Sequence, residues 1–232
     1  AARMWEKRTG ERLDGVMVID PIALRALLVA TGPVDLEGMQ ITADNVIEQL
    51  TVEQYRPVEG VDWELYDEAM AQRRNRLSAI AHLVLDKVEA GGWDTATLLQ
   101  EVSKVARARH ILAWSSHPEQ QAGWRAAGVS GELDGTSMAL SLLSQGGTKV
   151  DGWIPVEATL DRKGTSYSVT VSLVNNTPEG LPSYVAGPST HDDPNRGVPE
   201  GAYAGIITLN VPGVATSLSI DGVDRPLTEG RD

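Results

Sequence analysis

The residue pattern of this 232-residue chain changes near Gly146-Gly147. Before this point, short apolar runs such as residues 14–20 and 110–116 alternate with segments that repeat apolar residues at helical spacing, the longest over residues 62–90. After it, apolar and polar residues alternate in short runs bounded by Gly, Pro, Asn and Asp. The sequence therefore predicts an α/β or α+β domain over residues 1–146, the C-terminal part of a larger domain. A small antiparallel β-sandwich-like domain is predicted over residues 147–232.

Composition argues against several classes of protein and site. The chain has 20 basic and 32 acidic residues and a net charge of −12, which argues against general nucleic-acid binding. It has no cysteine, which excludes disulfides, thiolate catalysis and cysteine metal sites. No apolar run reaches the roughly 18 residues that span a bilayer, and the polar first 15 residues do not resemble a signal peptide. Because the chain opens in what reads as the end of a helix, we expect a longer parent protein.

Asp20 stands between a predicted strand and a predicted helix. Pro21 suits the first helical position and Gly32-Pro33 the helix end, so Asp20 fits the N-cap. A carboxylate at a strand end could instead hold Mg²⁺ on a phosphorylated substrate, and Asp14 at the other end of the strand is open to the same two interpretations. The spacing favours the cap, and we expect Asp20 to bind the backbone amides of its own helix.

Arginines gather near the predicted helix ends. Arg56 follows a predicted helix, and Arg73 and Arg76 lie just before the apolar stripe of the longest one. On a helix Arg73 shares a face with Leu77, and Arg76 with Ile80, so at least one guanidinium is expected at the margin of the core. Guanidinium pairs bind two phosphate oxygens at once, but arginines also cap helix ends and pair with carboxylates. Both interpretations stay open.

No complete catalytic signature is present, and no metal site is assigned. The candidates for chemistry are Asp20 and Arg56, with Arg73 and Arg76 as phosphate-binding residues. None of the four histidines, His82, His110, His117 and His191, has a partner at metal-ligand spacing. Residues 178–201 are expected to form a long surface loop. Within it, His191, Asp192, Asp193 and Asn195 offer either a site for a hard cation such as Ca²⁺ or a solvated turn.

Three stretches resemble the domain-of-unknown-function family 4012, found mostly in actinobacteria and other Gram-positive organisms. They are "WEKRTGERLDGVMVIDPIALRALLVATGPVDL", "RHILAWSSHPEQQAGWRAAGVSGEL" and "VNNTPEGLPSYVAGP". The resemblance covers nearly the whole chain in order. It implies a parent protein anchored by an N-terminal transmembrane helix outside this chain, with the present region extracytoplasmic. It implies no activity.

A second resemblance in layout is to the LytR-CpsA-Psr family. It rests on "DGVMVIDPIALRALLVATGPV", "YRPVEG" and "DEAMAQRRNRLSAIAHLVLDKV". Proteins of that family transfer glycopolymers from polyprenyl-pyrophosphate carriers to peptidoglycan, with arginines and aspartate-bound Mg²⁺ on the pyrophosphate. The resemblance implies such roles for Asp20, Arg56, Arg73 and Arg76. The chain departs from the pattern in lacking the family's Gln after the arginines and its upstream arginine and aspartate motifs. The acidic loop before the helix is altered to "EGVDWELYDE".

Three functions are weighed. The preferred one is a binding or scaffolding module of the cell envelope whose partner is a cell-wall polymer, a lipid-linked precursor or an envelope protein. The alternative is a phosphotransferase or pyrophosphatase, with Mg²⁺ as cofactor, that acts on polyprenyl-pyrophosphate-linked glycopolymers for cell-wall attachment. A hydrolase would need two carboxyl groups roughly 5–9.5 Å apart across a groove.

Overall fold

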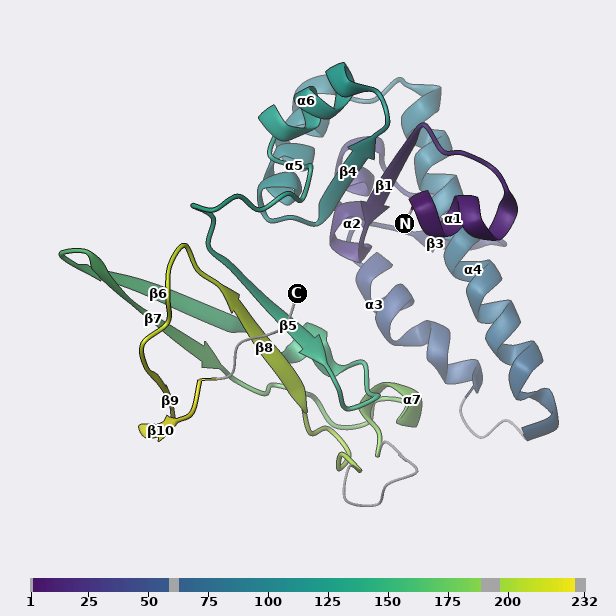
Figure 1. Cartoon of the computed structure of the whole chain (residues 1–232). Helices are drawn as coiled ribbons and strands as arrows, with labels where there is room; N and C mark the ends of the chain where they lie inside the picture. Colours follow the sequence, from purple (N-terminus) through teal and green to yellow (C-terminus); the bar gives the residue numbers. More distant parts are fainter. Residues whose placement is uncertain (1, 59–62, 189–196, 228–232) are drawn as a thin grey trace.

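The computed structural model describes residues 2–58, 63–188 and 197–227. Over these residues it is a mixed α/β structure in which each strand belongs to a small, two-stranded antiparallel sheet, and none of these sheets closes into a barrel. Figure 1 shows helices α1 to α6 gathered on one side of the molecule and the later strands, with the short helix α7, on the other. The mixed fold is confirmed, whereas the LytR-CpsA-Psr fold and the β-sandwich stay predictions.

The first sheet joins two segments that lie far apart in the sequence. Strand β1 (Gly15–Ile19) pairs with β4 (Ile111–Ser115), so that Ile19 lies opposite Ile111. The chain between them forms α2 (Pro21–Thr31), the hairpin β2 (Val34–Leu36) and β3 (Met39–Ile41), α3 (Val46–Thr51), the 3-10 helix η1 (Glu53–Val58), α4 (Trp63–Ala90) and α5 (Thr95–Arg107). Helix α1 (Ala2–Thr9) precedes this sheet, and α6 (Pro118–Ala126) follows it.

The main core lies where α2, the β2–β3 hairpin, α3 and α4 meet. Its buried members are Leu24, Leu27, Leu28, Val34, Ile41, Val46, Leu50, Ile80 and Val84. The apolar residues of the short hairpin and of α3 pack against one stripe of α4, which contains Ile80 and Val84. This packing fixes the position of α4 against the rest of the helical part. In the described ranges, no helix has both the length and the apolar character that crossing a bilayer requires.

Helices α4 and α5 bury fewer apolar residues than their sequences contain. On α4, Ile80 and Val84 are fully buried, but Leu77 and Leu85 remain 38% and 37% exposed, so the buried stripe is narrower than its sequence pattern. The apolar residues of α5 include Leu99, but this residue is exposed. The inward positions of α5 are those of Leu98, Val102 and Val105, and a neighbouring residue points about 100° away on a helix.

The later part of the chain consists mainly of hairpins and strand pairs. Strand β5 (Ala139–Ser144) pairs with β8 (Gly205–Asn210), β6 (Val156–Lys163) with β7 (Ser166–Leu173), and β9 (Leu218–Ile220) with β10 (Val223–Arg225). The predicted strands are therefore present. Strand β5 precedes Gly146-Gly147, whereas its partner β8 follows it, so one sheet contains residues from both sides of the predicted boundary. The division of the chain into two domains at residue 146 stays a prediction.

The segment expected to be a long surface loop is partly buried. It holds α7 (Ser183–Ala186), in which Val185 and Ala186 are buried. The backbone N–H of Lys149 donates to the Val185 carbonyl at 2.7 Å, just before the 3-10 helix η2 (Val150–Trp153). The candidate cation ligands His191, Asp192, Asp193 and Asn195 lie outside the described residues.

Ile80→Ala should lower the free energy of unfolding by about 2–5 kcal/mol, because it opens a cavity at a fully buried position. Leu77→Ala, one turn earlier on the same helix, is the matched control and should cost about 1 kcal/mol or less. Urea denaturation followed by circular dichroism measures both. Equal losses would contradict the burial of Ile80 in the core.

Candidate functional site

Asp20 caps α2, as the sequence predicts. Its Oδ1 accepts hydrogen bonds from the backbone N–H groups of Ile22 and Ala23, both at 2.9 Å. Its other oxygen, Oδ2, lies 2.6 Å from Nδ1 of His110. The carboxylate thus joins the start of α2 to the turn that leads into β4. Among the described residues, no arginine is bonded to it.

The Asp20–His110 contact was missed because the two residues are 90 positions apart. It follows from the antiparallel register of the first sheet, in which Ile19 pairs with Ile111, so that Asp20, which follows β1, lies beside His110, which precedes β4. At the opposite end of the ladder Asp14 Oδ1 lies 3.8 Å from His117 Nε2, with both side chains exposed. Pairing of "VMVI" with "ILAW" is the only signal from which these contacts could have been found.

The three candidate arginines, Arg56, Arg73 and Arg76, contact different partners. Arg73 Nη1 donates to the Tyr55 hydroxyl at 3.3 Å, and its guanidinium lies 5.1 Å from the centre of the same ring. Arg76 Nη2 donates to Gln49 Oε1 at 2.9 Å. Arg56 Nε donates to Glu53 Oε1 at 2.8 Å. The expectation of a guanidinium at the core margin is met, because the Nε atoms of Arg73 and Arg76 are both buried.

A groove of about 480 Å³ lies between the two parts of the chain. One wall comes from α3, η1 and the turn before α3: Asp44, Ile47, Glu48, Thr51, Val52 and Arg56. The other comes from η2 and the segment before α7: Lys149, Gly152, Trp153 and residues 178–181. Of the candidate arginines, Arg56 is the one that lines this groove.

The groove combines an aromatic surface with charges of both signs. Trp153 is half-buried, and its backbone carbonyl accepts from the Asn176 N–H at 2.9 Å, which ties the two segments of that wall together. Around it stand the carboxylates of Asp44, Glu48 and Glu179 and the cations of Arg56 and Lys149. These side chains can stack, accept and donate hydrogen bonds around one ligand. Sequence analysis missed all of them except Arg56, because the two walls meet only in the folded chain.

A stack of two tyrosines joins the groove walls. The rings of Tyr55, on η1, and Tyr184, on α7, have centroids 4.9 Å apart and an interplanar angle of 15°. Tyr55 is 7% exposed, and Arg73 covers it from α4. Burial raises the pKa of Tyr55; the Arg73 charge opposes this rise, and Tyr184 adds to it.

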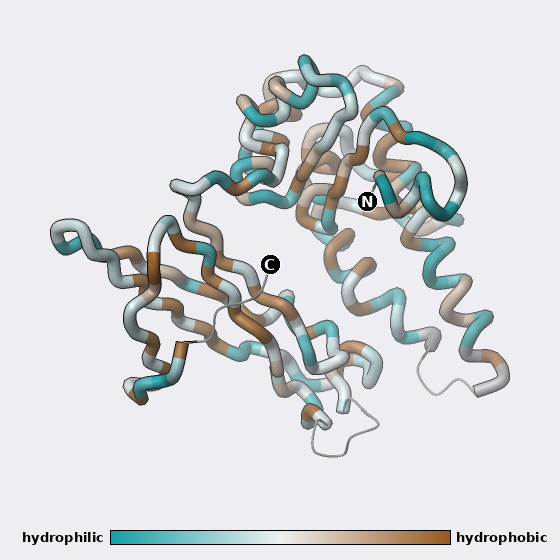
Figure 2. Tube along the Cα trace, in the orientation of Figure 1, coloured by the Kyte–Doolittle hydropathy of each residue, from teal (hydrophilic) through white to brown (hydrophobic). Residues whose placement is uncertain are grey.

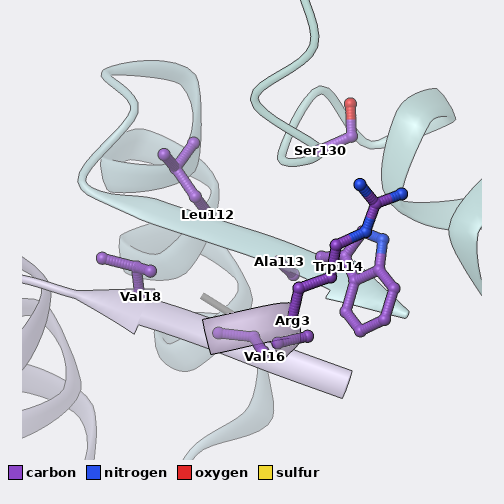
Figure 3. Close-up of a pocket in the computed structure, with 8 residues that line it drawn as sticks. Arg3, Val16, Val18, Leu112, Ala113, Trp114 and Ser130 are labelled. Atoms are coloured by element: carbon purple, nitrogen blue, oxygen red, sulfur yellow. The ribbon is translucent and has the colours of Figure 1, made fainter. Parts of the chain in front are cut away.

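A second hollow, of about 410 Å³, lies on the β1–β4 sheet. Figure 3 shows Val16, Val18 and Leu112 on the strands, with Arg3 and Trp114 at one end of the hollow. Its lining is mostly apolar, with Arg3 as its charged member, so it offers fewer polar contacts than the first groove. In the part of the chain that is described, no three His, Asp or Glu side chains are grouped as metal ligands.

Comparison with known proteins gives one match, to a family model over the first 55 residues, and no activity. Residues 1–55 match the model of a family described as "Protein of unknown function (DUF4012)". This match confirms the resemblance for the stretch that contains β1, α2 and Asp20. No curated protein and no solved structure matches the chain.

Asp20→Ala should lower the free energy of unfolding by about 1–2 kcal/mol, because α2 loses its cap. Asp20→Asn should cost less, because Asn caps helices about as well as Asp. Thermal or urea unfolding of Asp20→Ala, His110→Ala and the double variant measures the coupling between the two side chains, expected at about 0.5–1.5 kcal/mol. Strictly additive losses would contradict the contact between them.

The raised pKa of Tyr55 predicts a loss of stability in alkali. The unfolded chain releases this proton near the ordinary pKa of 10.0, before the folded chain does. The stabilisation is therefore fully present below pH 10.0 and is lost as pH rises through the higher folded pKa. Urea unfolding at a series of pH values should show a steeper alkaline decline for the native chain than for Tyr55→Phe. Parallel declines would rule out the buried phenol as the cause.

Proposed function

For a chain whose first 55 residues match a family without an assigned activity, we propose a binding function in the cell envelope. The chain is an extracytoplasmic module, tethered to the cell membrane by a segment outside it, as the family resemblance implies. The groove between α3–η1 and residues 149–181 holds its ligand, a polar polymer of the wall. The observation that carries the proposal is the set of side chains around Trp153.

The chemistry of the groove suits a saccharide chain. An indole ring packs against the C–H face of a sugar ring and keeps a polar edge for hydrogen bonding. The carboxylates of Glu48 and Glu179 accept hydrogen bonds from hydroxyl groups, and Arg56 and Lys149 donate them or neutralise an attached anion. A few polar groups arranged around an apolar surface is the usual composition of a ligand site.

The binding interpretation is also supported by the contacts of Asp20, a catalytic candidate, and of Arg73 and Arg76, the phosphate-binding candidates. Asp20 is bonded to the α2 amides and to His110, and Arg76 to Gln49. These contacts account for both residues by structural roles. Arg73 likewise supports the tyrosine stack, which holds the groove walls together.

The alternative, transfer or hydrolysis at a polyprenyl pyrophosphate, has one observation in its favour. Arg56 and Lys149 line the same groove from opposite walls, and two cations can share a phosphate. In that case catalysis would rest on positioning and charge stabilisation. Mg²⁺ would need carboxylates other than Asp20, such as those of Asp44 and Glu48. The LytR-CpsA-Psr-like fold belongs to this alternative.

Trp153→Ala should weaken binding of soluble cell-wall fragments roughly tenfold or more in calorimetric titration. Trp5→Ala is the matched control, because Trp5 is exposed on α1 away from the groove, and should leave affinity unchanged. Equal affinities for both variants would overturn the assignment of the groove.

Fragments with and without their phosphate groups separate the two functions. The binding proposal expects both sets to bind and neither to be altered. Release of phosphate from a lipid-linked pyrophosphate substrate, lost in both Arg56→Ala and Lys149→Ala, would replace it by the transferase or pyrophosphatase.

A further inference from the structure

The groove between α3–η1 and residues 149–181 is lined by charges of opposite sign that have no partners within the described chain. One wall holds the carboxylates of Asp44 and Glu48, and the other holds the Lys149 ammonium group and the Glu179 carboxylate. In the part of the chain that the structure describes, none of these four side chains forms an ion pair or a hydrogen bond. Lys149 therefore shares a groove with three carboxylates without binding any of them, and all four groups are available to a ligand.

The positions of these groups follow from the elements that carry them. Val46 and Leu50 of α3 are buried in the main core, whereas Glu48 between them is exposed. Figure 2 shows hydrophobic and hydrophilic residues following one another along α3. On the opposite wall, the backbone of Lys149 is fixed by its hydrogen bond to the Val185 carbonyl of α7. The charged side chains thus stand on segments whose backbones are held in place.

Negative charge predominates in the groove. Its lining has three carboxylates and two cations, and one of these cations, Arg56, already donates from Nε to Glu53 at 2.8 Å. A ligand with negative charge alone would therefore be repelled on entering, in a chain whose net charge is −12. A neutral ligand would cover the charged side chains without pairing them, which is unfavourable. Together the charges fit a ligand that carries both signs.

We infer that the ligand of the groove is zwitterionic, a sugar unit of the wall joined to a short peptide with a protonated amine and a carboxylate. The inference rests on the proposed function, because it names the class of wall polymer that the groove binds. Trp153 packs against the sugar ring, Asp44 and Glu48 bind the amine, and Lys149 binds the carboxylate. The groove volume of about 480 Å³ lies within the roughly 300–1,000 Å³ that is usual for small-ligand sites.

A matched set of muropeptides tests the charges of the ligand. The first probe is a disaccharide–peptide fragment with the free amine of a diamino acid and free carboxylates. The second is the same fragment with the amine acetylated, and the third has the carboxylates amidated. In calorimetric titration at low salt, the full chain should bind the first probe about threefold more tightly than either of the others, because each modified probe loses one charge pair.

The outcomes separate the inference from the proposed function. Equal or tighter binding of the modified probes, with Trp153→Ala still weakening all three, would overturn the zwitterionic ligand and leave the groove as a saccharide site. Failure of all three probes to bind would contradict the proposed function, and the inference with it.

Protein variants assign each charge of the ligand to a wall. The double variant Asp44→Asn/Glu48→Gln should weaken binding of the unmodified probe about threefold and leave binding of the acetylated probe unchanged, because that probe has no amine charge to lose. Lys149→Gln should show the same selectivity against the amidated probe. Glu157→Gln, at an exposed position of β6 outside the groove lining, is the matched control and should bind all probes as the native chain does. Losses that are equal for modified and unmodified probes would overturn the assignment.

Discussion

The Tyr55–Tyr184 stack is the contact on which the relation between the two parts of the chain depends. Tyr55 is buried beneath Arg73 of the longest helix, while Tyr184 lies on a short helix whose backbone holds Lys149. Both rings are rigid, and aromatic contacts of this kind contribute about 0.5–1.5 kcal/mol beyond their burial. This contact joins η1 to α7 beside the groove, whose two walls come from segments about 100 residues apart in the sequence, a separation typical of non-local pairing.

Local features of the sequence predicted much of the helical part. The Asp-Pro pair predicted the start of α2, and Gly32-Pro33 predicted its end. The 3.6-residue period of apolar residues predicted α4. These signals are reliable because they depend only on residues within one or two helical turns. The narrower buried stripe on α4 could not be predicted, because it depends on how much surface a short hairpin and α3 can cover. The later strands were predicted from alternation, but their partners were not.

The candidate site could be predicted only in part. Arg56 was a candidate from the sequence and lines the groove, whereas Trp153 and Lys149 line the same groove without any local signal of a ligand site. Asp20 has both kinds of contact. Its Oδ1 caps α2, which the neighbouring residues predicted, and its Oδ2 contacts His110, which they could not predict. Local patterns identify what a residue can do, and the pairing of remote segments decides which of these roles it takes.

The two Asp–His contacts at the ends of the β1–β4 ladder favour the observed register between these two strands. Five residue pairs form this ladder, with Asp20 and His110 just beyond one end and Asp14 and His117 near the other. Sliding one strand by a single residue would turn Ile111 and Ala113 toward solvent and would separate each carboxylate from its imidazole. The Asp20 carboxylate, which caps α2, therefore also favours the correct register of β1 and β4. A sheet with shifted register would lose the contact between Asp20 and His110, which joins α2 to β4.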